Sequence, residues 1–168
     1  MSDRDSGSVG FQWRVVWVFI LFVAIAAGCS RGTDVDAQML LVAKAQVGDI
    51  TVMEQALDKG ADVNQEWMLN SPLSWAIQGG HLAAVKFLVL KGAKINARFG
   101  LPERTALQQA AEGGNVDIVV YLVETGADVN ARNKFGRTAL HHARRGLGKD
   151  PKKAEEVARY LVSKGAVE

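Results

Sequence analysis

Apolar residues recur at helical spacing in four similar segments of the chain. In each segment they lie three and four residues apart, which predicts a helix with one buried face. A Gly-Ala pair follows each set, and the glycine suits the left-handed residue that ends a helix. The four sets are Met53, Ala56 and Leu57; Val85, Leu88 and Val89; Val119, Leu122 and Val123; and Ala158, Leu161 and Val162. The Gly-Ala pairs fall at 60–61, 92–93, 126–127 and 165–166.

Before three of these sets the sequence predicts another helix, which is the first helix of its unit. Ser71, Thr105 and Thr138 are placed to begin it, since a hydroxyl can accept a free backbone N–H at a helix start. An inward leucine and a small alanine follow in each case, at 73 and 76, 107 and 110, and 140 and 143. Gly48, Gly80 and Gly114 are placed to end these first helices. Each segment therefore reads as a helix–turn–helix unit.

These in-phase features resemble the ankyrin family over about residues 37–168. The resemblance implies an all-α ankyrin-repeat solenoid of four helix–turn–helix units joined by β-turn fingers. Its units are about 37–64, 65–97, 98–131 and 132–168. A period near 33 residues is typical of stacked helical repeats, which share one continuous core. Compared with the earlier units, the last carries six extra residues within 144–156, and a solenoid is expected to place them in a loop.

The fingers between the units differ from one another. "QEWMLN" (65–70) is one residue shorter than the family norm, and "RFGLPER" (98–104) is one longer. "RNKFGR" (132–137) has the standard length.

A hydrophobic leader precedes the repeats. Residues 15–27 carry no charge and follow a polar flank that contains Arg4 and Arg14. This run is shorter than the roughly 20 apolar residues that a membrane-spanning helix needs, and it has the parts of a secretory signal peptide.

Ala26-Ala27-Gly28-Cys29 resembles the lipobox of bacterial lipoproteins. The resemblance implies cleavage between Gly28 and Cys29 and a lipid on the Cys29 thiol. It divides the start of the chain into a signal peptide (1–28) and a lipidated cysteine with a short tether (29–36). An uncleaved anchor and an ordinary cleaved signal remain as alternatives. In lipoproteins, Ser30 beside the cysteine fits export, so we expect a bacterial envelope protein, lipid-anchored in the outer membrane and facing the periplasm.

The sequence offers no catalytic constellation. It lacks the G-x-S-x-G and H-E-x-x-H motifs, and a single cysteine excludes an intrachain disulfide or a multi-cysteine metal site. His141 and His142 are adjacent, about 100° apart around a helix, so they do not readily face one metal. Resemblance implies a structural His141 that bonds backbone within its unit. We expect no enzyme activity, metal, cofactor or small-molecule substrate.

A binding surface remains as the expected function. Partners of ankyrin proteins usually meet the fingertips and the exposed face of each first helix. Carried over by position, the finger candidates are Trp67, Met68, Phe99, Leu101, Arg104, Lys134, Phe135 and Arg137. The first-helix candidates are Gln78, Glu112 and Arg145. Two arrangements are possible for the aromatic side chains of Trp67, Phe99 and Phe135. They form one apolar stripe on the surface, or some of them fold back over the core.

Charge is distributed unevenly along the chain. Residues 31–66 carry three basic and seven acidic side chains, whereas residues 132–168 carry ten basic and four acidic ones. Such asymmetry can steer an acidic partner or an anionic membrane, or simply keep an end cap soluble. Because the leader is expected to export the chain, we do not expect nucleic acid as a partner.

We therefore expect a protein-binding module that supports an envelope enzyme or neutralises a toxin as an immunity protein. The alternative is a membrane-anchored scaffold that faces the cytoplasm through an uncleaved N-terminal helix.

Overall fold

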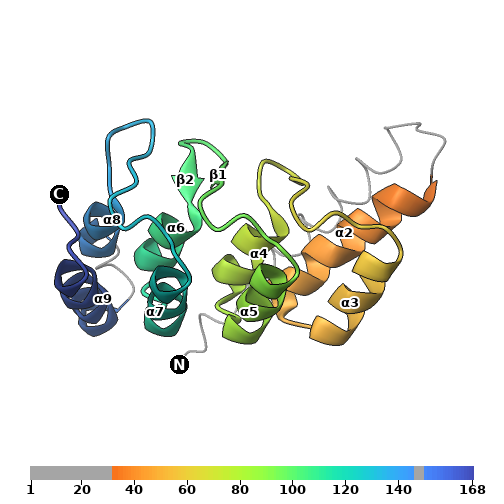
Figure 1. The fold of residues 1–168 in the computed structure, drawn as a ribbon, viewed down its shortest axis with the longest axis horizontal. Helices are drawn as coiled ribbons and strands as arrows, with labels where there is room; N and C mark the ends of the chain where they lie inside the picture. The colour runs from red at the N-terminus through yellow and green to blue at the C-terminus, as the bar shows by residue number, and fades with distance from the viewer. Residues whose placement is uncertain (1–31, 146–149) are drawn as a thin grey trace, which may run out of the picture. The chain divides into compact units, whose positions relative to one another are not determined.

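Four helix pairs make up the repeat domain. The computed structural model describes residues 32–145 and 150–168. The pairs are α2 (Gly32–Val47) with α3 (Ile50–Asp58), α4 (Pro72–Gly79) with α5 (Leu82–Leu90), α6 (Ala106–Glu112) with α7 (Val116–Glu124), and α8 (Ala139–Arg145) with α9 (Pro151–Ser163). Figure 1 shows the pairs stacked one after another, with the fingers projecting from the same edge. The predicted helix–turn–helix units are confirmed.

The predicted helix starts are present. Ser71 Oγ accepts a hydrogen bond from Ser74 N at 3.2 Å, and Pro72 occupies the first helical position of α4. Thr105 Oγ1 accepts from Gln108 N at 3.4 Å, and Gln108 Oε1 accepts from Thr105 N in return, which forms a capping box. Thr138 Oγ1 accepts from His141 N at 3.4 Å. Each hydroxyl satisfies a donor that the start of a helix leaves free.

One continuous core runs through the stack from Leu41 to Leu161. The inward leucines and alanines of the first helices are buried as predicted. Val162 was expected to face inward, and this was wrong, since its side chain is exposed. Its counterparts Val89 and Val123 pack against the core beside a following unit, whereas no described unit follows α9. Ala154 and Val157 are buried in the last helix with Leu161.

A ladder of asparagine side chains joins neighbouring units. Asn64 Nδ2 donates to Gly92 O at 3.1 Å, and Asn64 Oδ1 accepts from Lys94 N at 2.8 Å. Asn96 and Asn130 make the same pair of bonds to the unit that follows each of them. These three asparagines therefore join the stack by satisfying backbone groups of the next unit.

The three fingers have different backbones. In finger 1 (65–70), Trp67 and Asn70 form a bridge, and the two residues between them have positive φ angles of 53° and 65°. Finger 2 (98–104) holds the antiparallel strands β1 (Arg98–Phe99) and β2 (Arg104–Thr105). In finger 3 (132–137), the buried Asn133 accepts from Phe135 N and Arg137 N through Oδ1. The backbone conformation therefore differs from finger to finger, and with it the direction in which the tip residues project.

Two sequence expectations about segment boundaries need correction. The six extra residues were expected in a loop, but α9 has 13 residues where α7 has 9, so most of the insertion lengthens a helix. Pro151 at its first turn and Asp150 as its N-cap start the helix early. The tether was expected to reach residue 36, but α2 begins at Gly32.

The leader, with Gly28 and Cys29, lies outside the described residues. Among the helices that are described, none combines the length and apolar character needed to cross a bilayer.

Candidate interaction surface

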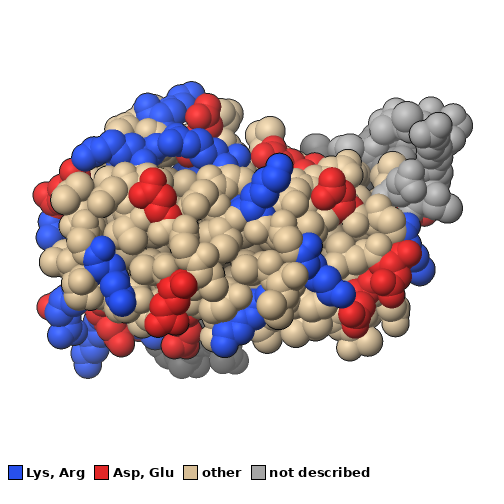
Figure 2. All heavy atoms as spheres, viewed as in Figure 1, with Lys and Arg blue, Asp and Glu red and all other residues tan. Residues whose placement is uncertain are grey.

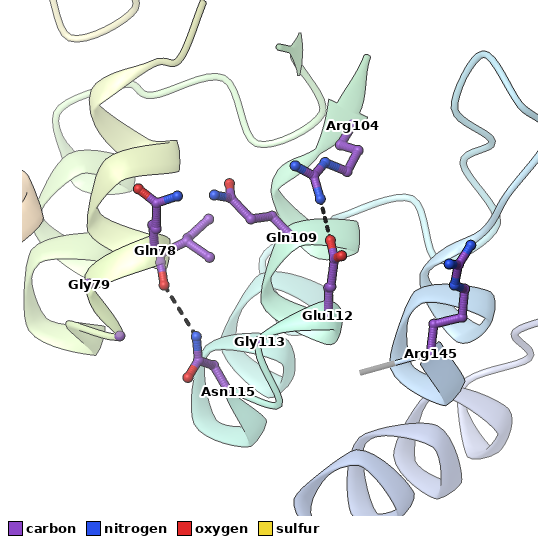
Figure 3. Close-up of a pocket in the computed structure, with 10 residues that line it drawn as sticks. Gln78, Gly79, Arg104, Gln109, Glu112, Gly113, Asn115 and Arg145 are labelled. Carbon is purple, nitrogen blue, oxygen red and sulfur yellow. Dashed lines mark hydrogen bonds and ion pairs between the residues drawn. The ribbon is translucent and has the colours of Figure 1, made fainter. Parts of the chain in front are cut away.

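The exposed ends of the first helices border a shared hollow. Gln78 at the end of α4, Glu112 at the end of α6 and Arg145 at the end of α8 all line it, as their equivalent positions in successive units predict. Arg104 of finger 2, Gln109 of α6 and Asn115 complete its polar lining (Figure 3). The hollow has a volume of about 500 Å³.

A second hollow of about 290 Å³ adjoins the first. Arg104, Glu112 and Arg145 line both, and the second adds Pro102, Arg137 and His142. We call the two together the groove. It brings together two predicted finger residues, Arg104 and Arg137, with all three predicted first-helix residues.

Positive charge prevails in the groove. Arg104 forms an ion pair with Glu112 (Figure 3). Arg137 and Arg145 have no ion-pair partner among residues 35–145 and 150–168. The groove therefore carries one balanced pair and two further guanidinium groups, which favours an anionic ligand.

His142 lies beside the one carboxylate of the groove. Its side chain is buried, and its Nδ1 lies 3.6 Å from Glu112 Oε2. Burial lowers the pKa of His142; Glu112 opposes that effect, whereas the positive charges of Arg104 and Arg137 add to it. The imidazole is therefore neutral at neutral pH, and Arg104 is the cation that balances Glu112.

The two adjacent histidines lie in different surroundings. His142 Nε2 lies 3.3 Å from Asn133 Nδ2 and so helps to hold finger 3. His141 Nε2 is buried and has no hydrogen-bond partner in the described ranges, so the backbone bond expected for it is wrong. Within those ranges no cluster of three metal-ligating side chains occurs.

The fingertips expose apolar side chains. Met68 is 55% exposed, Leu69 59%, Leu101 74% and Phe135 60%. We call these four residues the fingertip row. Leu69 was missed from the sequence, although it lies beside Met68 in the short turn of finger 1.

Phe99 is a correction to the predicted stripe of three aromatic residues. It is only 6% exposed and belongs to the core, so it does not offer a surface contact. Successive side chains of a strand point to opposite faces, so in β1 the exposed Arg98 faces solvent and Phe99 faces the core. Trp67 is half-buried. The apolar side chains that are exposed on the three fingers include Met68, Leu101 and Phe135, all of which were finger candidates in the sequence analysis.

Neighbouring fingers lie close together. Lys134 N of finger 3 donates to Pro102 O of finger 2 at 3.4 Å. A Cβ placed on Gly100 of finger 2 would lie 3.6 Å from Leu69 O of finger 1. The fingertip row is therefore a series of apolar groups on adjacent fingers. Phe135 connects it to positive charge, since Lys134 and Arg137 lie 5.8 and 5.5 Å from its ring centroid.

Fingers 2 and 3 are strongly basic. Together they carry five basic side chains and one acidic side chain. Figure 2 shows Lys and Arg gathered over the fingers that precede α6 and α8, while elsewhere on this face the two signs are interspersed. The basic residues are Arg98, Arg104, Arg132, Lys134 and Arg137.

Stacked helix pairs with a groove and projecting fingers define a helical-repeat solenoid, a class that presents extended concave surfaces to partners. Two family models agree with this: one described as "Ankyrin repeats (3 copies)" matches residues 100–167, and one described as "Ankyrin repeats (many copies)" matches residues 73–123. The fold of this chain is an all-α ankyrin solenoid. Its first helix pair lies outside the matched residues and extends the stack by one unit.

A curated relative carries the same repeats. The chain is 33% identical over 86 residues to the ankyrin repeat and KH domain-containing protein mask-1 of Caenorhabditis elegans. The alignment covers 51% of this chain and 3% of that protein. Ankyrin repeats usually mediate binding to other proteins, so the chain contains a protein–protein interaction module.

Proposed function

We propose that this chain is a non-catalytic binding protein whose fingertip row and groove together hold a partner protein. The observation that carries the proposal is the row of four exposed apolar side chains on three successive fingers, two of which also line the groove through Pro102, Arg104 and Arg137. Contiguous exposed apolar groups with a polar rim are typical of interaction sites. Aromatic and arginine side chains, here Phe135 and Arg137, are the types that most often anchor interfaces.

Truncating the fingertip row tests this proposal. Leu101→Ala and Phe135→Ala together are expected to weaken partner binding at least about tenfold, because each removes a large apolar contact. The measurement is capture of the partner from an envelope extract on the immobilised protein, followed by titration of the captured protein against each variant.

Leu90→Ala is the matched control. Leu90 is 83% exposed on α5 and belongs to neither the row nor the groove, so its truncation should leave binding unchanged. Equal binding by wild type and by the Leu101/Phe135 double variant would contradict the proposal.

We propose further that the protein works in a bacterial envelope, anchored by a lipid on Cys29. The support is the lipobox-like Ala26-Ala27-Gly28-Cys29 at the end of an uncharged run. Metabolic labelling with a palmitate analogue should mark the wild type and leave Cys29→Ala unlabelled, because the sulfur of Cys29 is the atom to which the lipid is attached. An unlabelled wild type would contradict a lipid anchor and favour the uncleaved anchor that faces the cytoplasm, and undiminished label on Cys29→Ala would contradict attachment at Cys29.

Two biological roles fit such a module. It supports an envelope enzyme, or it neutralises a toxin by covering that toxin's active site. The captured partner separates the roles: its activity rises or persists in the complex in the first case and is abolished in the second.

A further inference from the structure

We infer that the groove recognises an acidic segment of the partner protein, with Arg137 and Arg145 as the groups that bind its carboxylates. The inference rests on the proposed protein-binding function and adds the chemistry of the partner. It concerns the groove, whereas the fingertip row accounts for apolar contacts.

Charge balance inside the groove is the first argument. Glu112 is the only acidic residue that lines either hollow, and Arg104 already pairs with it. Because His142 is neutral at neutral pH, it does not compete for that carboxylate. Arg137 and Arg145, which have no ion-pair partner in the described ranges, are thus left to meet charge from outside. A guanidinium group matches a carboxylate in both charge and planar geometry.

The fixed polar lining is the second argument. Ser74 Oγ donates to Gln109 Oε1 at 2.8 Å, which turns the amide NH₂ of Gln109 away from Ser74. In Figure 3 the Gln109 amide points across the hollow toward Gln78. Asn115 Nδ2 donates to Ile77 O at 3.2 Å and so ties the start of α7 to the end of α4. A lining held in place before binding loses little entropy when a ligand enters.

The surroundings favour a protein segment over other anions. Single-stranded nucleic acid binds proteins through aromatic platforms on which bases stack, and among the groove's lining residues only the buried His142 has an aromatic ring. The fingertip row, on fingers of which two line the groove, needs apolar partners, which an acidic peptide can carry between its carboxylates. A groove of this size also admits several side chains of an extended segment.

Peptide binding to the full chain in neutral detergent tests the inference. The probe is a fluorescein-labelled peptide of about twelve residues in which glutamates alternate with leucine and serine; a second peptide replaces every glutamate by glutamine. We expect the glutamate peptide to bind about tenfold more tightly at low salt, and its affinity to fall as salt is added. Fluorescence anisotropy measures both.

Charge reversals identify the residues responsible. Arg145→Glu and Arg137→Glu should each weaken binding of the glutamate peptide about tenfold, because each replaces an attraction by a repulsion. Arg159→Glu is the matched control, since Arg159 is an exposed arginine on α9 that lines neither hollow of the groove. It changes net charge equally and should alter affinity less than about twofold. Circular dichroism confirms that each variant is folded.

Several outcomes would overturn the inference. These are equal affinity for the two peptides, equal loss in Arg145→Glu and Arg159→Glu, or tighter Arg145-dependent binding of single-stranded DNA or anionic vesicles. The fingertip proposal fails independently: if Leu101→Ala with Phe135→Ala leaves partner capture intact while the peptide still requires Arg145, the fingertip proposal is wrong and the groove assignment stands.

Discussion

Replacing Gly79 by alanine is expected to destabilise the repeat domain by about 3 kcal/mol, the upper end of what overpacking usually costs. A Cβ on Gly79 would overlap Gln46 O and lie 2.6 Å from His81 Cδ2. Gln46 O belongs to the backbone of α2, so it cannot swing aside as a side-chain tip would. The first two units must therefore separate where α2 and α4 meet. The measurement is the free energy of unfolding from urea titrations followed by circular dichroism.

Gly113→Ala provides the matched control for this prediction. Gly113 precedes Gly114 as Gly79 precedes Gly80, in the next unit. Its φ of −76° and ψ of −10° suit alanine, and its nearest neighbour is the side-chain Nδ2 of Asn115 at 3.0 Å. We expect a change within about 1 kcal/mol of zero, since alanine also restricts the unfolded chain. Equal effects at the two glycines would contradict the assigned clash.

Gln108→Leu is expected to cost about 3 kcal/mol and to loosen finger 3. Gln108 is fully buried. Its Nε2 donates to Ala131 O at 2.7 Å and to Arg137 O at 3.1 Å, and its Oε1 accepts from Thr105 N. Leucine has a similar size but leaves these backbone groups without partners. Each buried donor or acceptor without a hydrogen bond costs about 1–3 kcal/mol of folding stability.

Two measurements check the effect of Gln108→Leu. Urea unfolding reports the lost stability, and limited trypsin digestion reports cleavage at Lys134 and Arg137, which should become faster when finger 3 is released. Gln78→Leu is the control, because Gln78 is exposed on α4. It should change stability by less than about 0.5 kcal/mol. Unchanged trypsin cleavage in Gln108→Leu would show that other contacts hold the finger.

Much of the fold was predictable because its signals are local. A hydroxyl before an apolar run, an inward leucine and a glycine at the end act within one unit, so Ser71, Leu73 and Gly80 could each be assigned from sequence. The capping-box spacing of Thr105 and Gln108 was a signal for Gln108 that the sequence analysis left unused. The convergence of Gln78, Glu112 and Arg145 was predictable as well, since equivalent positions of stacked repeats share one face.

The remaining features depend on contacts between units. Phe99 could have faced either side of finger 2, and the strand pair placed it inside. The pairing of Arg104 with Glu112 and the burial of His142 depend on how finger 2, α6 and α8 approach one another. No local pattern specifies that approach.

By itself the sequence determined the period, the starts of α4, α6 and α8 and most of the core residues, because backbone hydrogen bonding and amphipathic spacing operate over a few residues. Only the tertiary structure decided which finger side chains reach the surface and which charges are left without a partner. Those outcomes depend on packing between residues of different units, and the few kilocalories that select one arrangement arise only when the units meet.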